Sequence, residues 1–250
     1  MNKKIFNLVV LLVMLLVLMY GLTGCSQKPS EEEANDAVIK EMEEVYGDKF
    51  TVIRNGVNVS NDLFGTNPVY EVFLESENLD NKEIKVDYRY NKNSGKYDYE
   101  YCNYNFIKYE EEILEELEVL DEIYDDYKLL LSPRADDMVK VSYEEYKESE
   151  NTLQMHIIVS PNASKSNKEK DFEKLRKSLE ENELLISRIN IIYTNEEDVF
   201  DELDSKDEDD IIGYARLNGG IEGMFYLDED YKTKDMSRWV EHKKSKTMEK

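Results

Sequence analysis

Cysteine and histidine side chains are the ones in this chain best suited to nucleophilic, acid–base or metal chemistry, and the chain contains two of each. Cys25 stands after an apolar segment and directly follows the small residues Thr23 and Gly24. A peptidase that cuts before Cys25 must bind the preceding residues in an extended form, and bulky side chains there would clash. Small residues at such positions are typical of the segment before the cleavage site of an export leader.

The residues before Cys25 have the composition of an export leader. Lys3 and Lys4 form a positive start, and Leu8 to Met19 is an apolar run of 12 residues. Such a run is typical of a signal peptide and is shorter than the roughly 20 residues that span a bilayer. The alternative is an uncleaved anchor helix over residues 5–22. In both cases we expect the rest of the chain outside the cytoplasmic membrane.

The tetrapeptide Leu22-Thr23-Gly24-Cys25 resembles the lipobox of bacterial lipoproteins of the Gram-positive type. The resemblance implies that residues 1–24 are removed as a signal peptide and that the Cys25 thiol carries a diacylglyceryl group. It also implies a lipid anchor on the extracytoplasmic face of the cell membrane, where two acyl chains hold a protein stably. The polar residues 25–33 would then form a tether.

The formal net charge of −24 limits the classes of partner that this chain can bind. A surface this acidic repels nucleic acid and anionic wall polymers, and it favours cationic partners or a diffuse cloud of divalent ions. Solubility alone also explains the charge. An apolar content of 40% with alternating patterns predicts folded domains.

The order of the expected elements predicts an α+β fold with two small domains, each with an antiparallel or mixed sheet packed by one or two helices. We place the boundary at Ser132-Pro133, where a polar run without apolar periodicity begins. The expected parts after the tether are an N-terminal domain at 34–131, a linker at 132–137, a C-terminal domain at 138–230 and a basic tail at 231–250.

Apolar residues at helical spacing predict an N-terminal helix over 34–46. Strands are expected over 50–53, 69–74, 84–90, 97–101 and 128–131, with turns at Asn55-Gly56 and 91–95. A helix capped by Asn105 would bury a stripe made of Ile113, Leu117, Leu120 and Tyr124.

The second half of the chain follows a different order of elements. The patterns predict a helix at 143–148, a strand at 153–159, a helix at 168–181, a strand at 186–193, a helical turn at 196–203 and a hairpin of 211–217 with 224–227. The run from Asp201 to Asp210 is interpreted as an acidic loop that is either solvated or a weak site for divalent ions.

Tyrosines alternate with charged residues in two strands of the N-terminal domain: Tyr88, Tyr90, Tyr97, Tyr99 and Tyr101. Antiparallel pairing through the turn at 91–95 would place them on one face as an aromatic ladder. Such a face either binds sugar rings or an aromatic partner, or packs beneath the helices at 34–46 and 105–124. We take it as the possible binding surface.

No catalytic residue, metal site or cofactor is predicted. His156 alternates with apolar residues, which favours a structural position, and His242 lies in the basic tail. Neither belongs to an H-E-x-x-H motif or a Cys/His cluster. Glu100 and Tyr101 precede Cys102, and a neighbouring acid disfavours the thiolate that catalysis needs.

The tail supplies a second possible contact surface. Trp239 follows Met236 at helical spacing and is surrounded by basic residues, including Lys243 and Lys244. An amphipathic turn of this kind could lie on anionic lipid, so Trp239, Lys243 and Lys244 are possible membrane contacts. The alternative is a disordered chain end.

Residues 34–104 are similar to a PepSY-type domain, with one helix followed by a small antiparallel sheet. Tyr70-Glu71-Val72 stands where that family has its Y-x-V strand, and residues 85–96 resemble its strand and turn, with Ser94 in place of the usual threonine. The resemblance implies an extracytoplasmic modulator of peptidases that has no catalytic residues of its own.

These observations predict a membrane-anchored, non-catalytic binding or accessory module at the cell surface, with an envelope protein or a wall component as its partner. One alternative is a wall-glycan hydrolase that uses a pair of carboxylates. The other is the PepSY-like modulator of peptidases. A solute receptor for a transporter is disfavoured, because such receptors are usually larger and built on parallel sheets.

Overall fold

The computed structural model describes residues 30–58, 69–91, 93–133, 138–148, 153–206 and 208–244. The expected leader, the tetrapeptide that resembles a lipobox and its Cys25 lie outside the described residues, as do residues 134–137 of the expected linker. Within the described ranges, no helix has both the length and the apolar character needed to cross a membrane.

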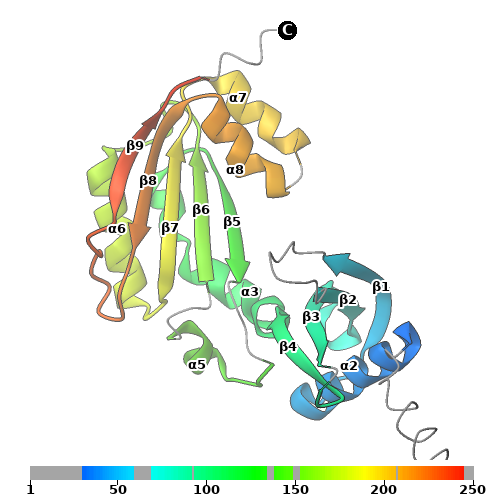
Figure 1. The fold of residues 1–250 in the computed structure, drawn as a ribbon. Helices are drawn as coiled ribbons and strands as arrows, with labels where there is room; N and C mark the ends of the chain where they lie inside the picture. The colour runs from blue at the N-terminus through cyan, green and yellow to red at the C-terminus, as the bar shows by residue number, and fades with distance from the viewer. Residues whose placement is uncertain are drawn as a thin grey trace, which may run out of the picture.

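The chain forms two separate sheets with helices packed on them, which confirms the predicted α+β class (Figure 1). The first sheet has four antiparallel strands in the order β1-β2-β3-β4, and the second has five in the order β5-β6-β7-β8-β9. The second sheet is mixed, because β6 and β7 are parallel while its other neighbours are antiparallel.

The first sheet is covered by one helix. This part contains α2 (Glu31–Tyr46), β1 (Thr51–Asn58), β2 (Val69–Glu75), a short 3-10 turn (Glu77–Leu79), β3 (Ile84–Asn91) and β4 (Lys96–Cys102). Val38 and Met42 of α2 are fully buried against the sheet. Asn55 and Gly56, expected to form a turn, lie inside β1 opposite Val72 and Glu71. Strand β1 continues to Asn58, so the Asn-Gly pair does not end it.

Helix α2 begins earlier than expected. Ser30 and Glu33 form a capping box, in which the Ser30 hydroxyl accepts from the Glu33 amide and the Glu33 carboxylate accepts from the Ser30 amide. Gly47 ends the helix in the left-handed conformation, with φ 80°. Residues 31–33, assigned to the tether from their polarity, are therefore the first turn of the helix.

The remaining elements surround the second sheet. They are α3 (Tyr104–Glu116), α4 (Val119–Ile123), β5 (Tyr127–Pro133), α5 (Tyr143–Lys147), β6 (Leu153–Val159), α6 (Lys168–Glu181), β7 (Ile186–Tyr193), α7 (Glu197–Glu202), a 3-10 turn (Leu203–Ser205), α8 (Glu208–Leu217), β8 (Gly220–Tyr226) and β9 (Arg238–His242). Helix α6 covers one face of the second sheet, whereas α7 and α8 lie on the other (Figure 1).

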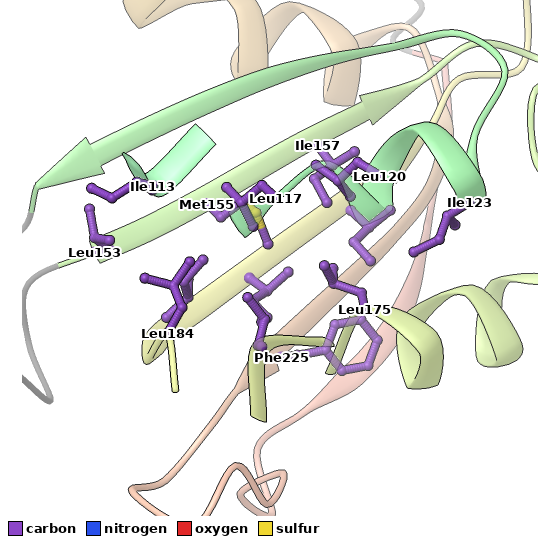
Figure 2. Close-up of a cluster of buried hydrophobic side chains, with 14 of the residues drawn as sticks. Ile113, Leu117, Leu120, Ile123, Leu153, Met155, Ile157, Leu175, Leu184 and Phe225 are labelled. Atoms are coloured by element: carbon purple, nitrogen blue, oxygen red, sulfur yellow. The ribbon is translucent and has the colours of Figure 1, made fainter. Parts of the chain in front are cut away.

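The expected domain boundary differs from the packing. The stripe of Ile113, Leu117 and Leu120 is buried against Met155 and Ile157 of β6 (Figure 2), and β5 is an edge strand of the second sheet. The change from one core to the other falls at the start of α3, where Tyr104 belongs to the first core and Phe106 to the second. An apolar stripe indicates that a helix buries one face, but it does not indicate which sheet it covers.

Four further parts of the chain differ from the sequence interpretation. Residues 211–217 are helical in α8 and not the first strand of a hairpin, and the acidic run from Asp201 to Asp210 lies mostly in α7, the 3-10 turn and α8. Asn105 does not cap α3, since Asn103 precedes the helix and the Asn105 side chain donates to the Val139 carbonyl at 2.9 Å. Residues 238–242 of the expected tail form β9, so the C-terminal unit extends beyond residue 230.

Candidate ligand-binding site

A β-bulge divides the tyrosines of β4 between the two faces of the first sheet. Tyr99 lies opposite Tyr88 and Tyr97 lies opposite Tyr90, but the register shifts before Tyr101, which lies opposite Asp87. The bulge adds one residue to β4, so the side chains beyond it change faces. Tyr101 therefore leaves the expected ladder, and its ring contacts Lys85, with Nζ 5.7 Å from the ring centroid.

The other tyrosine rings of β3 and β4 pack with Tyr70 of β2, which is not one of the five expected ladder residues. Tyr70 stacks on Tyr88 with ring centroids 5.5 Å apart, and Tyr88 meets Tyr97 edge to face at 5.5 Å and 76°. Tyr90 packs on Tyr97 at 5.4 Å and 55°. Tyr70 stands at alternate positions with the buried Val72 and Leu74, but Phe73 between them is buried too, so β2 has no clear alternation from which its face could be read.

These four rings line a pocket of about 340 Å³ at the N-terminal end of α2, which we call the tyrosine pocket. Its volume lies near the lower limit of the range for small-molecule sites. The pocket is lined by Ser30, Glu31, Ala34, Asn55, Gly56, Val57, Tyr70, Glu71, Tyr88, Tyr90 and Tyr97. Tyr99 is packed against the α2 core and does not line it. Three of the five expected ladder residues are thus brought together in a concave site.

Gly56 determines how the β1 wall of the pocket is built. A Cβ at this position would lie 2.7 Å from Glu71 Oε2 and 3.4 Å from the Glu71 Cβ. Glycine therefore allows the Glu71 side chain to lie close to the β1 backbone. The Glu71 carboxylate is held there by Lys85, at 2.8 Å from its Nζ.

The hydroxyls of Tyr88 and Tyr97 in the pocket stay protonated near pH 7. Burial raises the pKa of Tyr88 to about 12, and the nearby hydroxyls of Tyr97 and Tyr70 and the Glu31 carboxylate add to the effect. Burial likewise raises the pKa of Tyr97, with further contributions from Tyr90 and Glu33. Tyr88 and Tyr97 are therefore neutral hydrogen-bonding groups with apolar faces, which suits binding and not proton transfer near pH 7.

Of the possible membrane contacts of the tail, Trp239 lies in the second sheet, and Lys243 and Lys244 directly follow its last strand. Trp239 lies in β9 and is half-buried over Gly223, with its ring centroid 5.1 Å from that of Phe225 and 5.9 Å from that of Tyr193. Lys243 and Lys244 are both exposed, and Lys244 forms an ion pair with Glu196 at 2.9 Å. The indole is therefore part of the packing of the sheet.

The structure also assembles polar residues that the sequence analysis treated separately. The Glu222 carboxylate accepts from Arg216 Nε at 2.9 Å and from His242 Nε2 at 2.7 Å, and the Glu222 side chain is only 1% exposed. Burial opposes ionisation of Glu222, but the hydrogen bonds from Arg216 and His242 outweigh it and lower the Glu222 pKa. These contacts join α8 and β9 to β8, so we interpret the cluster as structural.

His156 is buried beside Asn190, with Nδ1 2.9 Å from the Asn190 side-chain amide nitrogen. Burial lowers the His156 pKa to about 4, and the positive charges of Arg188 and Arg216 act in the same direction. The ring is therefore neutral near pH 7 and occupies a structural position.

Cys102 and the acidic run are the remaining candidates for a catalytic or metal site. The Cys102 thiol is buried, with Sγ 3.7 Å from the Tyr46 hydroxyl and 3.8 Å from Met42 Sδ, so it belongs to the first core. Within the described ranges, no cluster of three or more His, Cys, Asp or Glu residues is arranged to hold a metal ion.

Neither a family profile nor a curated protein sequence matches this chain. Among solved structures, the chain is similar to a DUF5037 family protein from Ruminococcus gnavus ATCC 29149. The identity is 11%, the TM-score is 0.45, and the match covers 81% of this chain and 95% of that one. A likeness at this level carries no functional argument, so the function is argued from the chain's own residues.

Proposed function

We propose that this protein is a lipid-anchored, extracytoplasmic binding lipoprotein that holds a small ligand in the tyrosine pocket. The observation that carries the proposal is the pocket of about 340 Å³ lined by Tyr70, Tyr88, Tyr90 and Tyr97. Aromatic walls with a few polar groups are typical of binding sites.

The lipobox supports a position for this pocket close to the membrane. Ser30 lines the pocket and is only five residues after Cys25. A fully extended chain spans at most about 3.6 Å per residue, so Ser30 would lie within roughly 18 Å of the acylated cysteine. The expected ligand is therefore one that is presented at or near the outer surface of the membrane.

The geometry favours binding over the alternative of a glycan hydrolase. A hydrolase needs two carboxylates on either side of the bond to be cut, one of them with a raised pKa. Of the two acidic residues lining the pocket, Glu71 is held in an ion pair by Lys85. Burial raises the pKa of Asp87, but Asp87 does not line the pocket.

Two experiments test the proposal. Cells fed a labelled fatty acid should label the wild-type protein but not Cys25→Ala, which should lose its stable attachment to the membrane. For the second experiment, the purified full chain carries fluorotyrosine and is titrated with choline, lysine amide or N-acetylglucosamine disaccharide. A ligand that enters the pocket should cause saturable ¹⁹F NMR shifts at Tyr90 and Tyr97. An unlabelled protein would contradict the anchor, and an unchanged spectrum with every probe would contradict the binding pocket.

A further inference from the structure

The charge of the tyrosine pocket is negative. Its lining contains Glu31 and Glu71 and, among the residues that the structure describes there, no lysine, arginine or histidine. Glu71 is neutralised by Lys85, but Glu31 accepts a hydrogen bond from the neutral Asn55 amide, at 2.8 Å from Oε1, and that contact leaves its charge in place. A ligand in this pocket therefore meets a carboxylate without a matching cation.

The N-terminus of α2 at the edge of the pocket is not an anion site. Free backbone amides at a helix start attract anions. Here the Ser30 hydroxyl and the Glu33 carboxylate form the capping box, and the first turn carries Glu31, Glu32 and Glu33. These three acids offset the positive end of the helix dipole, so the helix start repels a phosphate or carboxylate ligand.

The tyrosines present their rings in several orientations. Tyr88 and Tyr97 meet at 76°, and Tyr90 is tilted by 55° from Tyr97, while Tyr70 lies nearly parallel to Tyr88. Tyr70, Tyr90 and Tyr97 are partly exposed, so part of each ring is accessible. Aromatic walls of this kind, combined with an acidic group, bind alkylammonium ions through cation–π attraction.

From these observations we propose that the tyrosine pocket binds an alkylammonium group, which the faces of Tyr90 and Tyr97 surround and the Glu31 carboxylate partly neutralises. The inference rests on the proposed binding function and names the ligand class of the same site. The acidic net charge of −24 favours the approach of a cationic ligand. The group could be quaternary, as in a choline headgroup, or primary, as in a lysine side chain.

The test compares a cation with a neutral molecule of the same shape. The full chain, purified in a neutral polyoxyethylene detergent, is titrated calorimetrically with choline and with 3,3-dimethyl-1-butanol, in which carbon replaces the ammonium nitrogen. Lysine amide tests the primary ammonium, and N-acetylglucosamine disaccharide tests a sugar ligand. We expect at least one ammonium probe to bind about tenfold or more tightly than the neutral isostere.

Matched variants locate the interaction. Glu31→Gln and Tyr97→Leu should each weaken ammonium binding about five- to tenfold, and Tyr97→Phe, which keeps the ring face, should weaken it less than Tyr97→Leu. Glu32→Gln, an exposed neighbour outside the pocket lining, should bind like the wild type. Circular dichroism melting of each variant shows whether a loss of binding reflects a loss of fold.

The outcomes separate this inference from the function it rests on. If neither ammonium probe binds more tightly than the neutral isostere while the isostere binds, or if the disaccharide alone binds tightly, the ammonium assignment is overturned and the binding function is left intact. Binding by none of the probes would overturn both. Ammonium binding that Glu31→Gln and Tyr97→Leu leave unchanged in folded protein would place the site elsewhere and overturn the assignment.

Discussion

The carboxylate of Glu222 and the ring of His242 lie 2.7 Å apart, and this contact joins β8 to the edge strand β9. The two residues are 20 positions apart in the sequence. They meet because Gly220 of β8 pairs with His242 and brings the end of β9 back along the sheet. The same carboxylate also holds Arg216 at the end of α8.

Replacing Glu222 should therefore loosen two elements at once. Glu222→Leu leaves Arg216 and His242 without their shared partner, and we expect a loss of about 1 to 3 kcal/mol in the free energy of unfolding. Arg216 is partly exposed, which keeps the loss toward the lower end. Urea unfolding measures it. Glu241→Leu, an exposed position on β9, is the control, and an equal loss there would contradict the role of the cluster.

Acid should destabilise the protein through His156. Its folded pKa is about 4 and its ordinary value is 6.5, so the unfolded chain binds a proton that the folded protein does not between these values. Stability should therefore fall by roughly 3 kcal/mol as the pH drops from 6.5 to 4. His156→Gln should flatten this part of the curve, as measured by urea unfolding at a series of pH values. The lowered Glu222 pKa would still cause a loss below about pH 4.5.

The single tryptophan makes the packing of β9 directly observable. A Cβ at Gly223 would overlap both the Trp239 and Phe225 rings, so Gly223→Ala should displace the indole and shift its fluorescence to the red. We also expect a loss of about 1 to 3 kcal/mol in stability, as for other overpacked cores. Gly213→Ala in α8 is the matched control, because nothing lies within 4 Å of its Cβ and alanine favours a helix. An unchanged Trp239 spectrum in Gly223→Ala would contradict the placement of the strand.

The assignment of α3 to the second core can be tested with two nearby aliphatic residues. Ile113 is fully buried against the second sheet, whereas Leu114 is 44% exposed. Ile113→Ala should cost about 2 to 5 kcal/mol, and Leu114→Ala much less. In Ile113→Ala, hydrogen exchange should accelerate more in β6 and β7 than in β2 and β3. Faster exchange confined to the first sheet would mean that α3 packs there instead.

The capping box of α2 predicts a local effect at the edge of the pocket. Ser30→Ala removes the side-chain acceptor of the Glu33 amide and should cost about 0.5 to 2 kcal/mol of helix stability. Ser30→Asp keeps an acceptor and should restore most of it. Hydrogen exchange of the first turn of α2 distinguishes the two variants, and equal rates in both would contradict the cap.

Much of the local structure could be read from short-range patterns. The helix at 168–181 and the strand at 186–193 agree with α6 and β7 residue for residue, because each is a run with one clear period between polar breaks. Residues 211–217 show where this approach fails. Ile211 and Ile212 have strand propensity, but Ile211 and Ala215 pack one helical turn apart against Ile158 and Ile192 of the sheet. Tertiary contacts outweigh a weak local preference.

The candidate site shows the same division. The tyrosines of β3 and β4 and their alternation are visible in the chain, and three of them do line the pocket. The exclusion of Tyr101 depends on the bulge in β4, where the register shifts opposite Asp87 and Tyr88. The contribution of Tyr70 depends on the pairing of β2 with β3, and that of Glu31 depends on the position of α2. A one-residue shift in register reverses every face beyond it, and no local pattern records that shift.

The prediction of a leader, the acidic character and the existence of most helices and strands follow from residues close together in the chain, because sequence motifs, net charge and amphipathic periodicity are local properties. The sheet that α3 covers, the pairing of β9 and the closure of four tyrosines around a pocket follow from contacts between distant residues. Such contacts form only where the complete set of apolar faces can be buried together, and several local arrangements are compatible with the same short-range pattern.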